Sequence, residues 1–359
     1  MLRVHDRAFH YVRMIFCAAG LVLSGCQTVP VASLAFLPEA GSIQKTAEPQ
    51  AQEAAQRQPA SPYNQQANQL IHQALEHYSN GELNRAKVLL ASAREIDPGH
   101  IGTFEIEAQL SYDMGDRNQF LQSLRAIRAA SPDDSEKQSA IGTLFFQAGQ
   151  TQEGIACLNR AIELKPHDEN YALKLASFYE QAGRTDEAQK VLLKALHTTP
   201  GSRRLPIALG RICEASQQWS QASVYYAMVV NHFPENHVWR KQRARCLYYS
   251  GNFTSAFEEF SICQKNDPES LSLAEIIAFG DAALQIGNLE KAQSLFDDLS
   301  VKYQRQLIHV EILRGLCAIN RGQSTSAKNI IATARKKWPN DETLLEVAAL
   351  IPPEQPIVR

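Results

Sequence analysis

The chain has 359 residues with 44% apolar side chains, which is enough for one or two ordinary domains or for one long solenoid. Its 36 basic and 38 acidic side chains leave a net charge of −2, so no overall field favours nucleic acid or an anionic membrane. The seven cysteines form no CxxC pair and lack the Cys/His spacing of a zinc site, which argues against a metal or redox role.

The first 25 residues have the layout of a secretory signal. Arg3, Arg7 and Arg13 precede a short apolar run over residues 14–23, and positive charge followed by such a run is typical of an exported protein. The run is too short to cross a bilayer, which needs about 20 apolar residues. The alternative is a buried hydrophobic helix that happens to end in a cysteine.

Cys26 directly follows this run. The tetrapeptide Leu-Ser-Gly-Cys that ends at Cys26 resembles the lipobox of bacterial lipoproteins. The resemblance implies that Cys26 is acylated, becomes the first mature residue and holds the protein on a membrane. Gln27 stands where an Asp would retain an enterobacterial lipoprotein in the inner membrane, so the resemblance also implies the outer membrane, facing the periplasm.

A polar segment separates the cysteine from the rest of the chain. Residues 27–66 are rich in Gln, Ala, Pro and Ser and have no sustained apolar period. Such a composition cannot bury enough surface to fold. We therefore expect residues 26–66 to comprise the lipidated cysteine and a flexible tether.

From residue 67 the sequence repeats with a period close to 34 residues, the sign of a repeat architecture. A turn position recurs at Gly81, Gly115, Gly149, Gly183, Gln217, Gly251, Gly287 and Gly322. Seven residues before each turn stands a small residue, at Ala74, Ala108, Gly142, Ala176, Gly210, Ala244, Gly280 and Gly315. Seventeen residues after each turn stands a proline, except in the seventh unit, which has Gln304 there.

Each of these positions has a physical meaning. A turn glycine ends a first helix because glycine takes positive φ freely, and the proline ends a second helix because it has no backbone donor. Small residues let the two antiparallel helices approach closely. One such hairpin cannot bury its apolar faces alone, so the units must stack.

This spacing resembles the tetratricopeptide repeat. The resemblance implies an all-α fold, a right-handed superhelix of about eight helix-turn-helix units. The expected units are 67–100, 101–134, 135–168, 169–202, 203–236, 237–272, 273–307 and 308–339. Two departures are the absence of the family's first-helix Trp and the missing glycine at Gln217. A capping helix is expected over 340–351, started by Asn340 or Asp341 and stopped by prolines, with a tail at 352–359.

No motif predicts catalysis, a cofactor or a metal. Paired acids such as Asp133-Asp134 and Glu258-Glu259 are interpreted as solvated charge or as compensation of a helix dipole. The cysteines of the repeats are expected to be buried free thiols, with at most two disulfides as the alternative. These cysteines are Cys157, Cys213, Cys246, Cys263 and Cys317.

The resemblance places a partner-binding groove on the first helices of the units. Counting the groove positions in units five and six gives Arg204, Arg211, Lys241, Arg245, Tyr248 and Tyr249. Basic side chains beside aromatic rings suit an extended acidic or C-terminal peptide. The alternative is a solvated charged face, and the family's carboxylate-clamp pattern is not reproduced.

The sequence leaves three candidate functions. The first is an anchored assembly scaffold, resembling the tetratricopeptide lipoproteins of tight-adherence (Flp) and type IV pili. The second is a periplasmic adaptor for polysaccharide export, outer-membrane protein insertion or peptidoglycan enzymes. The third, an enzyme or its regulatory subunit, is disfavoured because no reactive motif occurs, so we expect a protein or peptide partner, no nucleic acid and no cofactor.

Overall fold

The computed structural model describes residues 62–351, which contain seventeen α-helices and no strand. The signal, Cys26 and residues 27–61 of the expected tether lie outside the described residues, as does the tail at 352–359. The helices are α3 (Pro62–Ser79) and α4 (Leu83–Ile96), α5 (Ile101–Asp113) and α6 (Arg117–Ala130), α7 (Ser135–Gln147) and α8 (Thr151–Leu164), α9 (Glu169–Gln181) and α10 (Thr185–Thr198), α11 (Arg204–Ala215) and α12 (Trp219–His232), α13 (His237–Tyr249) and α14 (Phe253–Asn266), α15 (Leu273–Gln285) and α16 (Leu289–Lys302), α17 (Ile308–Asn320) and α18 (Ser324–Lys337), and α19 (Glu342–Ala349).

These helices form eight consecutive pairs followed by α19, which confirms the predicted fold class. Every turn glycine of the repeat has a positive φ, and Gln217, which replaces glycine in the fifth unit, takes a φ of 57°. The left-handed turn is therefore kept even where the side chain disfavours it. No helix among residues 62–351 combines the length and the apolar character that a membrane crossing needs.

The first helix starts earlier than expected. Helix α3 begins at Pro62, so residues 62–66 are helical and do not belong to the tether. Proline is favoured at the first helical position because its fixed φ suits the helix and its missing N–H has no intrahelical partner there. Because this stretch is polar, its composition did not predict that a helix starts there.

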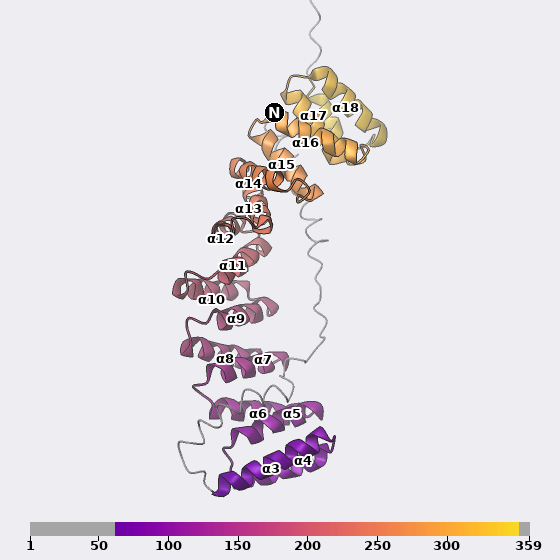
Figure 1. The fold of residues 1–359 in the computed structure, drawn as a ribbon. Helices are drawn as coiled ribbons and strands as arrows, with labels where there is room; N and C mark the ends of the chain where they lie inside the picture. The colour runs from indigo at the N-terminus through magenta and orange to yellow at the C-terminus, as the bar shows by residue number, and fades with distance from the viewer. Residues whose placement is uncertain (1–61, 352–359) are drawn as a thin grey trace, which may run out of the picture. The chain divides into compact units, whose positions relative to one another are not determined.

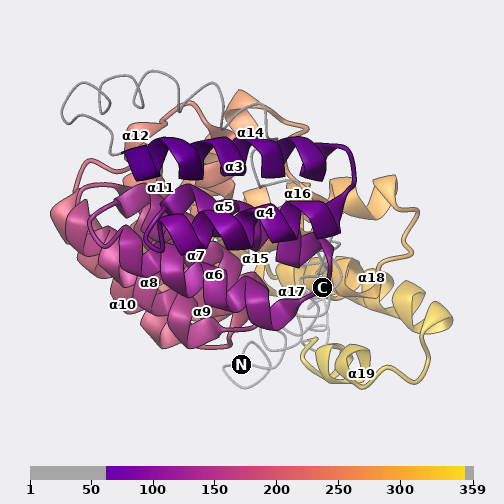
Figure 2. The same ribbon diagram turned by 90° about the horizontal axis from the view of Figure 1, so that it is seen from below.

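Two compact bodies make up the described chain, residues 62–205 and residues 206–351. In the first body the pairs α3–α4 to α9–α10 stack in chain order (Figures 1 and 2). Helices α7 and α8 approach closely, because a Cβ at Gly154 would come within 2.7 Å of the Gly142 carbonyl oxygen. The small residues of the repeat thus serve the close packing for which they were predicted.

The second body has an aromatic and aliphatic core that runs from α13 to α19. Gly280 of α15 faces the ring of Phe296 of α16, and a Cβ there would lie 2.6 Å from the ring. Helix α19 packs on α17 and α18 with Leu344 and Val347 fully buried. Its N-cap is Asp341, whose carboxylate accepts from the Leu344 amide at 2.9 Å.

The seventh unit ends differently from the others. Helix α16 is followed by Gln304 and Arg305, which have φ values of 50° and 55°. Two successive left-handed residues here end the helix where the other units use a proline. The next helix, α17, begins at Ile308 without a side-chain cap.

Candidate protein-binding surfaces

The cations predicted to line a groove are mostly engaged within the chain. Arg204 bonds Asn170 at 2.6 Å and lies 3.5 Å from a Glu169 oxygen. Lys241 donates to the Ser270 carbonyl at 2.7 Å. Arg211 of α11 is exposed to solvent. Whether these residues bind a partner stays a prediction. Arg204 and Arg211 are exposed, and Arg211 has no ion pair or side-chain hydrogen bond among the described residues.

Arg245 belongs to a polar cluster that joins α11, α12 and α13. Its guanidinium lies 3.0 Å from Glu214, and the same carboxylate accepts from the Tyr226 hydroxyl at 2.9 Å. Burial, together with Glu214, raises the pKa of Tyr226 far above its usual value. The charge of Arg245 is therefore neutralised locally.

The two tyrosines do not face a groove, and the expectation for them is wrong. Tyr248 is 1% exposed and donates to the buried Asp281 of α15 at 2.6 Å. Tyr249 is 8% exposed and its ring packs on Trp219 at a centroid distance of 4.6 Å. The positions that the family uses for binding hold core aromatics here, because this body packs large rings between its helices.

Glu259 was also misread as solvated. It is 7% exposed and bridges Arg240 at 2.8 Å and Arg243 at 2.5 Å. Its neighbour Glu258 is exposed, as expected. Helical spacing turns adjacent residues toward different faces, so the pair divides between core and solvent.

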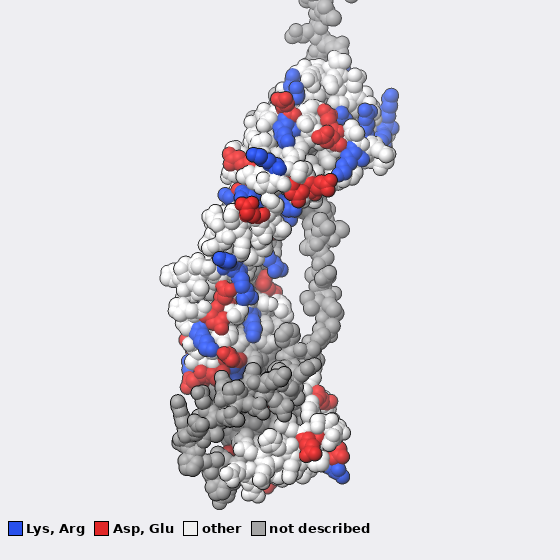
Figure 3. Space-filling model, viewed as in Figure 1, with Lys and Arg blue, Asp and Glu red and all other residues white. Residues whose placement is uncertain are grey.

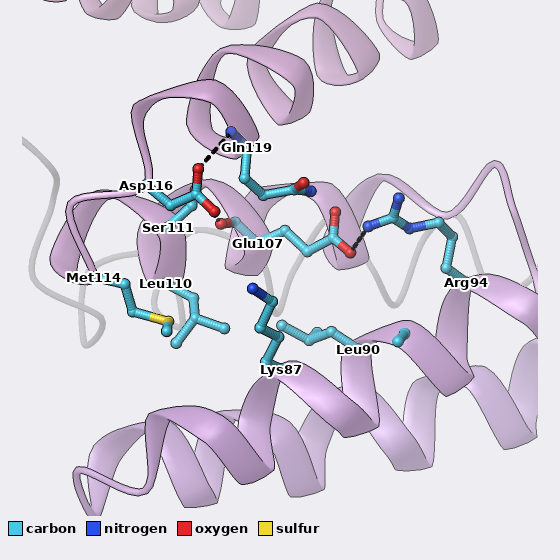
Figure 4. A pocket seen from close by; sticks show the side chains of 10 residues that line it. Lys87, Leu90, Arg94, Glu107, Leu110, Ser111, Met114, Asp116 and Gln119 are labelled. Carbon is cyan, nitrogen blue, oxygen red and sulfur yellow. Dashed lines mark hydrogen bonds and ion pairs between the residues drawn. The ribbon is translucent and has the colours of Figure 1, made fainter.

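The structure reveals a pocket in the first body that sequence reasoning missed. It lies between α4, α5 and α6, with a volume of about 100 Å³ (Figure 4). Leu90, Leu110 and Met114 form its apolar wall. Lys87 extends from α4 toward α5, and Asp116 stands at the α6 end, where it accepts from the Gln119 amide at 3.1 Å.

Glu107 is the buried charge of this pocket. It is 7% exposed, pairs with Arg94, and lies 3.5 Å from the Ser123 hydroxyl. The Arg94 Nε is buried without a hydrogen-bond partner among the described residues. An apolar wall beside charges of both signs suits a side chain with an apolar body and a polar tip.

A second hollow, between α6 and α8, is lined by three arginines, of which Arg125 and Arg160 are paired with acids. Arg125 makes two hydrogen bonds to Glu153, at 2.7 and 3.1 Å. Arg160 pairs with Asp133 at 2.8 Å and with Glu163 at 3.1 Å. The hydrogen bond from Arg125 is the main cause of the lowered pKa of Glu153.

The cysteines and acids of the described part assemble no group that could hold a metal ion. Among residues 62–351 no three His, Cys, Asp or Glu side chains are placed to hold a metal ion. The five cysteines of the repeats are buried free thiols. Burial raises the pKa of Cys263 and of Cys317 to about 11, which makes both poor nucleophiles near neutral pH.

Comparisons with known proteins identify the type of repeat. A family profile described as "Tetratricopeptide repeat" matches residues 145–205, which include α8 to α10. The solved structure of Naa15/Naa10 bound to HypK-THB is similar to 80% of this chain, with a TM-score of 0.55 and 13% sequence identity, and the match covers 44% of that chain. This chain therefore spans less than half the length of that relative. No curated protein sequence matches significantly.

Two smaller proteins are also similar. YrrB, described as a TPR protein with an unusual peptide-binding site, matches 52% of this chain and 95% of its own, with 19% identity and a TM-score of 0.42. PilW, described as a type IV pilus biogenesis factor, matches 59% and 97%, with 17% identity and a TM-score of 0.38. The family match identifies a tetratricopeptide repeat within residues 145–205, and the similarity to Naa15/Naa10 shows a shared helical fold over 80% of this chain.

Proposed function

We propose that this chain is a non-catalytic scaffold of the bacterial cell envelope, which binds proteins through its repeats and is held on the outer membrane by lipid on Cys26. The observation that carries the scaffold proposal is the succession of eight helix pairs along the sequence. Within each body, stacked pairs expose one helix face after another, which is the surface that a protein or peptide ligand needs.

The anchor rests on different observations. Leu-Ser-Gly-Cys ends at Cys26 after a charged and then apolar leader, and a polar stretch separates it from the first helix. The same combination supports a place in pilus or secretion-system assembly, facing the periplasm. A periplasmic adaptor of polysaccharide export, outer-membrane protein insertion or peptidoglycan synthesis is the second candidate, because it would need the same anchor and repeats.

Replacing Cys26 tests the anchor. Wild-type protein should sediment with membranes at high salt and carry the added mass of acyl chains, and Cys26→Ser should be found in the soluble fraction without that mass. Cys17→Ser is the matched control, since it changes the other cysteine that precedes the repeats. Sedimentation of Cys26→Ser with membranes at high salt would refute the assignment.

Affinity capture of the full-length protein tests the scaffold. We expect envelope proteins to copurify with wild type and to be lost or reduced when exposed Arg211 of α11 is changed to Glu. The control is Lys190→Glu on α10, a charge reversal at another exposed position. A partner set that is identical for all three proteins would remove Arg211 from the binding surface, and an empty capture would argue against a scaffold.

A further inference from the structure

Five cations gather where α16 and α18 end. Lys302 is the last residue of α16 and Arg305 follows in the loop, while Arg335, Lys336 and Lys337 are the last three residues of α18. All five are exposed. Lys337 donates from Nζ to the Arg305 carbonyl at 3.0 Å, so the two helix ends adjoin. We call these five residues the α16/α18 cation cluster, and Figure 3 shows lysine and arginine side chains projecting from α18 at the upper right.

The cluster has no acidic counterpart. Among residues 62–351, none of the five cations forms an ion pair with a carboxylate. Most other second helices are followed within a few residues by an acid, at Asp97, Asp133, Asp168, Glu235 and Asp267, and α18 is followed in the same way by Asp341, whereas no acid follows α16 within a few residues. From residue 300 to residue 339 the sequence has one acid, Glu311, which is buried against Arg314.

Helix dipoles do not account for this many cations. The C-terminus of a helix carries roughly half a negative charge, so the ends of α16 and α18 together offset about one of the five. The acids Asp341 and Glu342 stand at the N-terminus of α19, where they complement the positive end of that helix. The acids nearest in sequence, Asp298, Asp341 and Glu342, form no ion pair with the five cations among residues 62–351, so the cations outnumber the acids around these helix ends.

We propose that the α16/α18 cation cluster docks a segment of a partner protein that is rich in Asp and Glu, an inference that rests on the proposed scaffold function. Lysine and arginine donate charge-assisted hydrogen bonds to carboxylates. A membrane is disfavoured because surface-binding helices insert apolar side chains as well as attracting charge. On α18, Ala327, Ile331 and Ala334 are buried in the core. Val301, next to Lys302, is exposed, but one such side chain does not make the continuous apolar face of a membrane-binding helix.

The test measures binding of fluorescently labelled poly-L-glutamate to the full-length chain. One variant combines Lys302→Gln, Arg335→Gln and Lys336→Gln and leaves Lys337 on its carbonyl contact. The control combines Lys87→Gln, Lys190→Gln and Lys194→Gln, which removes three exposed charges from α4 and α10. We expect the cluster variant to bind about tenfold more weakly, the control to bind like wild type, and wild-type binding to fall with added salt.

Carbodiimide crosslinking locates the contact, because it couples lysine amines to glutamate carboxylates that touch them. Crosslinks should map to Lys302, Lys336 and Lys337. Equal binding by wild type and cluster variant, or crosslinks elsewhere, would overturn the proposal. So would a higher affinity of the cluster for phosphatidylglycerol vesicles or single-stranded DNA than for poly-L-glutamate. These outcomes concern the cluster alone, whereas failure of the scaffold proposal is seen in the capture experiment.

Discussion

Each of the five repeat cysteines lies inside a helix, with its sulfur in the core. Desolvation disfavours the thiolate, which raises the pKa of Cys157, Cys213 and Cys246 as well as those of Cys263 and Cys317. At a pKa of about 11, roughly one thiol in a thousand is ionised at pH 8. These cysteines therefore act as small apolar residues rather than as reactive groups.

A variant with Cys17→Ser and Cys26→Ser isolates these five thiols. We expect almost no reaction with Ellman's reagent at pH 8 in the native state and five equivalents in guanidinium chloride. Because the folded pKa is raised above the usual value of 9, the thiols add stability below that value and lose it as the pH rises toward about 11. Rapid labelling of the native protein would show that at least one sulfur is accessible.

Tyr248 and Tyr249 show which property of a single residue could not be predicted from the sequence. The repeat count placed Tyr248 and Tyr249 correctly on a first helix, but it could not tell a groove position from a core position. Their burial depends on Asp281, which lies 33 residues further along and accepts the Tyr248 hydroxyl bond, and on the ring of Trp219. Such partners come from neighbouring helices, and a single repeat unit does not encode them.

At the scale of elements, α13 and α14 are joined by a buried carboxylate. Glu259→Gln would leave the guanidiniums of Arg240 and Arg243 beside a neutral amide. Removing one partner of a buried ion pair is strongly destabilising, but Arg243 is partly exposed, so we expect a loss of about 2–3 kcal/mol in the free energy of unfolding. Glu258→Gln, one residue earlier and exposed, should change it by less than about 0.5 kcal/mol. Similar urea midpoints for the two variants would show that the bridge is not a stabilising contact.

Helix order was predictable because the turn glycines, small residues and prolines recur in register. The start of α3 at Pro62 differs from the expected start at residue 67, because it falls in a polar stretch without a repeat marker. The end of α16 also lacks a marker, since Gln304 and Arg305 form it and their side chains give no turn signal, although α17 begins at Ile308, where the eighth unit was expected to start. The α16/α18 cation cluster forms at that unmarked end, and it was not among the predicted sites.

At the scale of the whole molecule, each repeat is stabilised mainly by the units next to it, as the chain of neighbouring helix contacts requires. A local defect should therefore weaken its own unit most and distant units least. The close approach of α7 and α8 is the best place to introduce such a local defect. There the neighbour of the missing Cβ is a backbone carbonyl, which cannot rotate away.

Gly154→Ala has two opposite effects on the free energy of unfolding. Alanine favours the helix by about 0.5–1 kcal/mol, but its Cβ would lie 2.7 Å from the Gly142 oxygen and 3.2 Å from the Phe146 nitrogen, which forces α7 and α8 apart. Overpacking of this kind costs about 1–3 kcal/mol, so we expect net destabilisation. Gly201→Ala, where a Cβ meets nothing within 4 Å, is the control and should leave stability nearly unchanged.

Hydrogen exchange then measures how far along the chain of helices the loss of stability extends. In Gly154→Ala, amide protection should fall most in α7 and α8, less in α6 and α9, and not measurably in α17 to α19, because coupling passes from unit to unit and weakens at each step. Equal loss of protection in all helices would mean that residues 62–351 unfold as one cooperative block. Unchanged protection in α7 and α8 would instead place Gly154 outside the tight helix contact and would contradict the role assigned to the small residues of every unit.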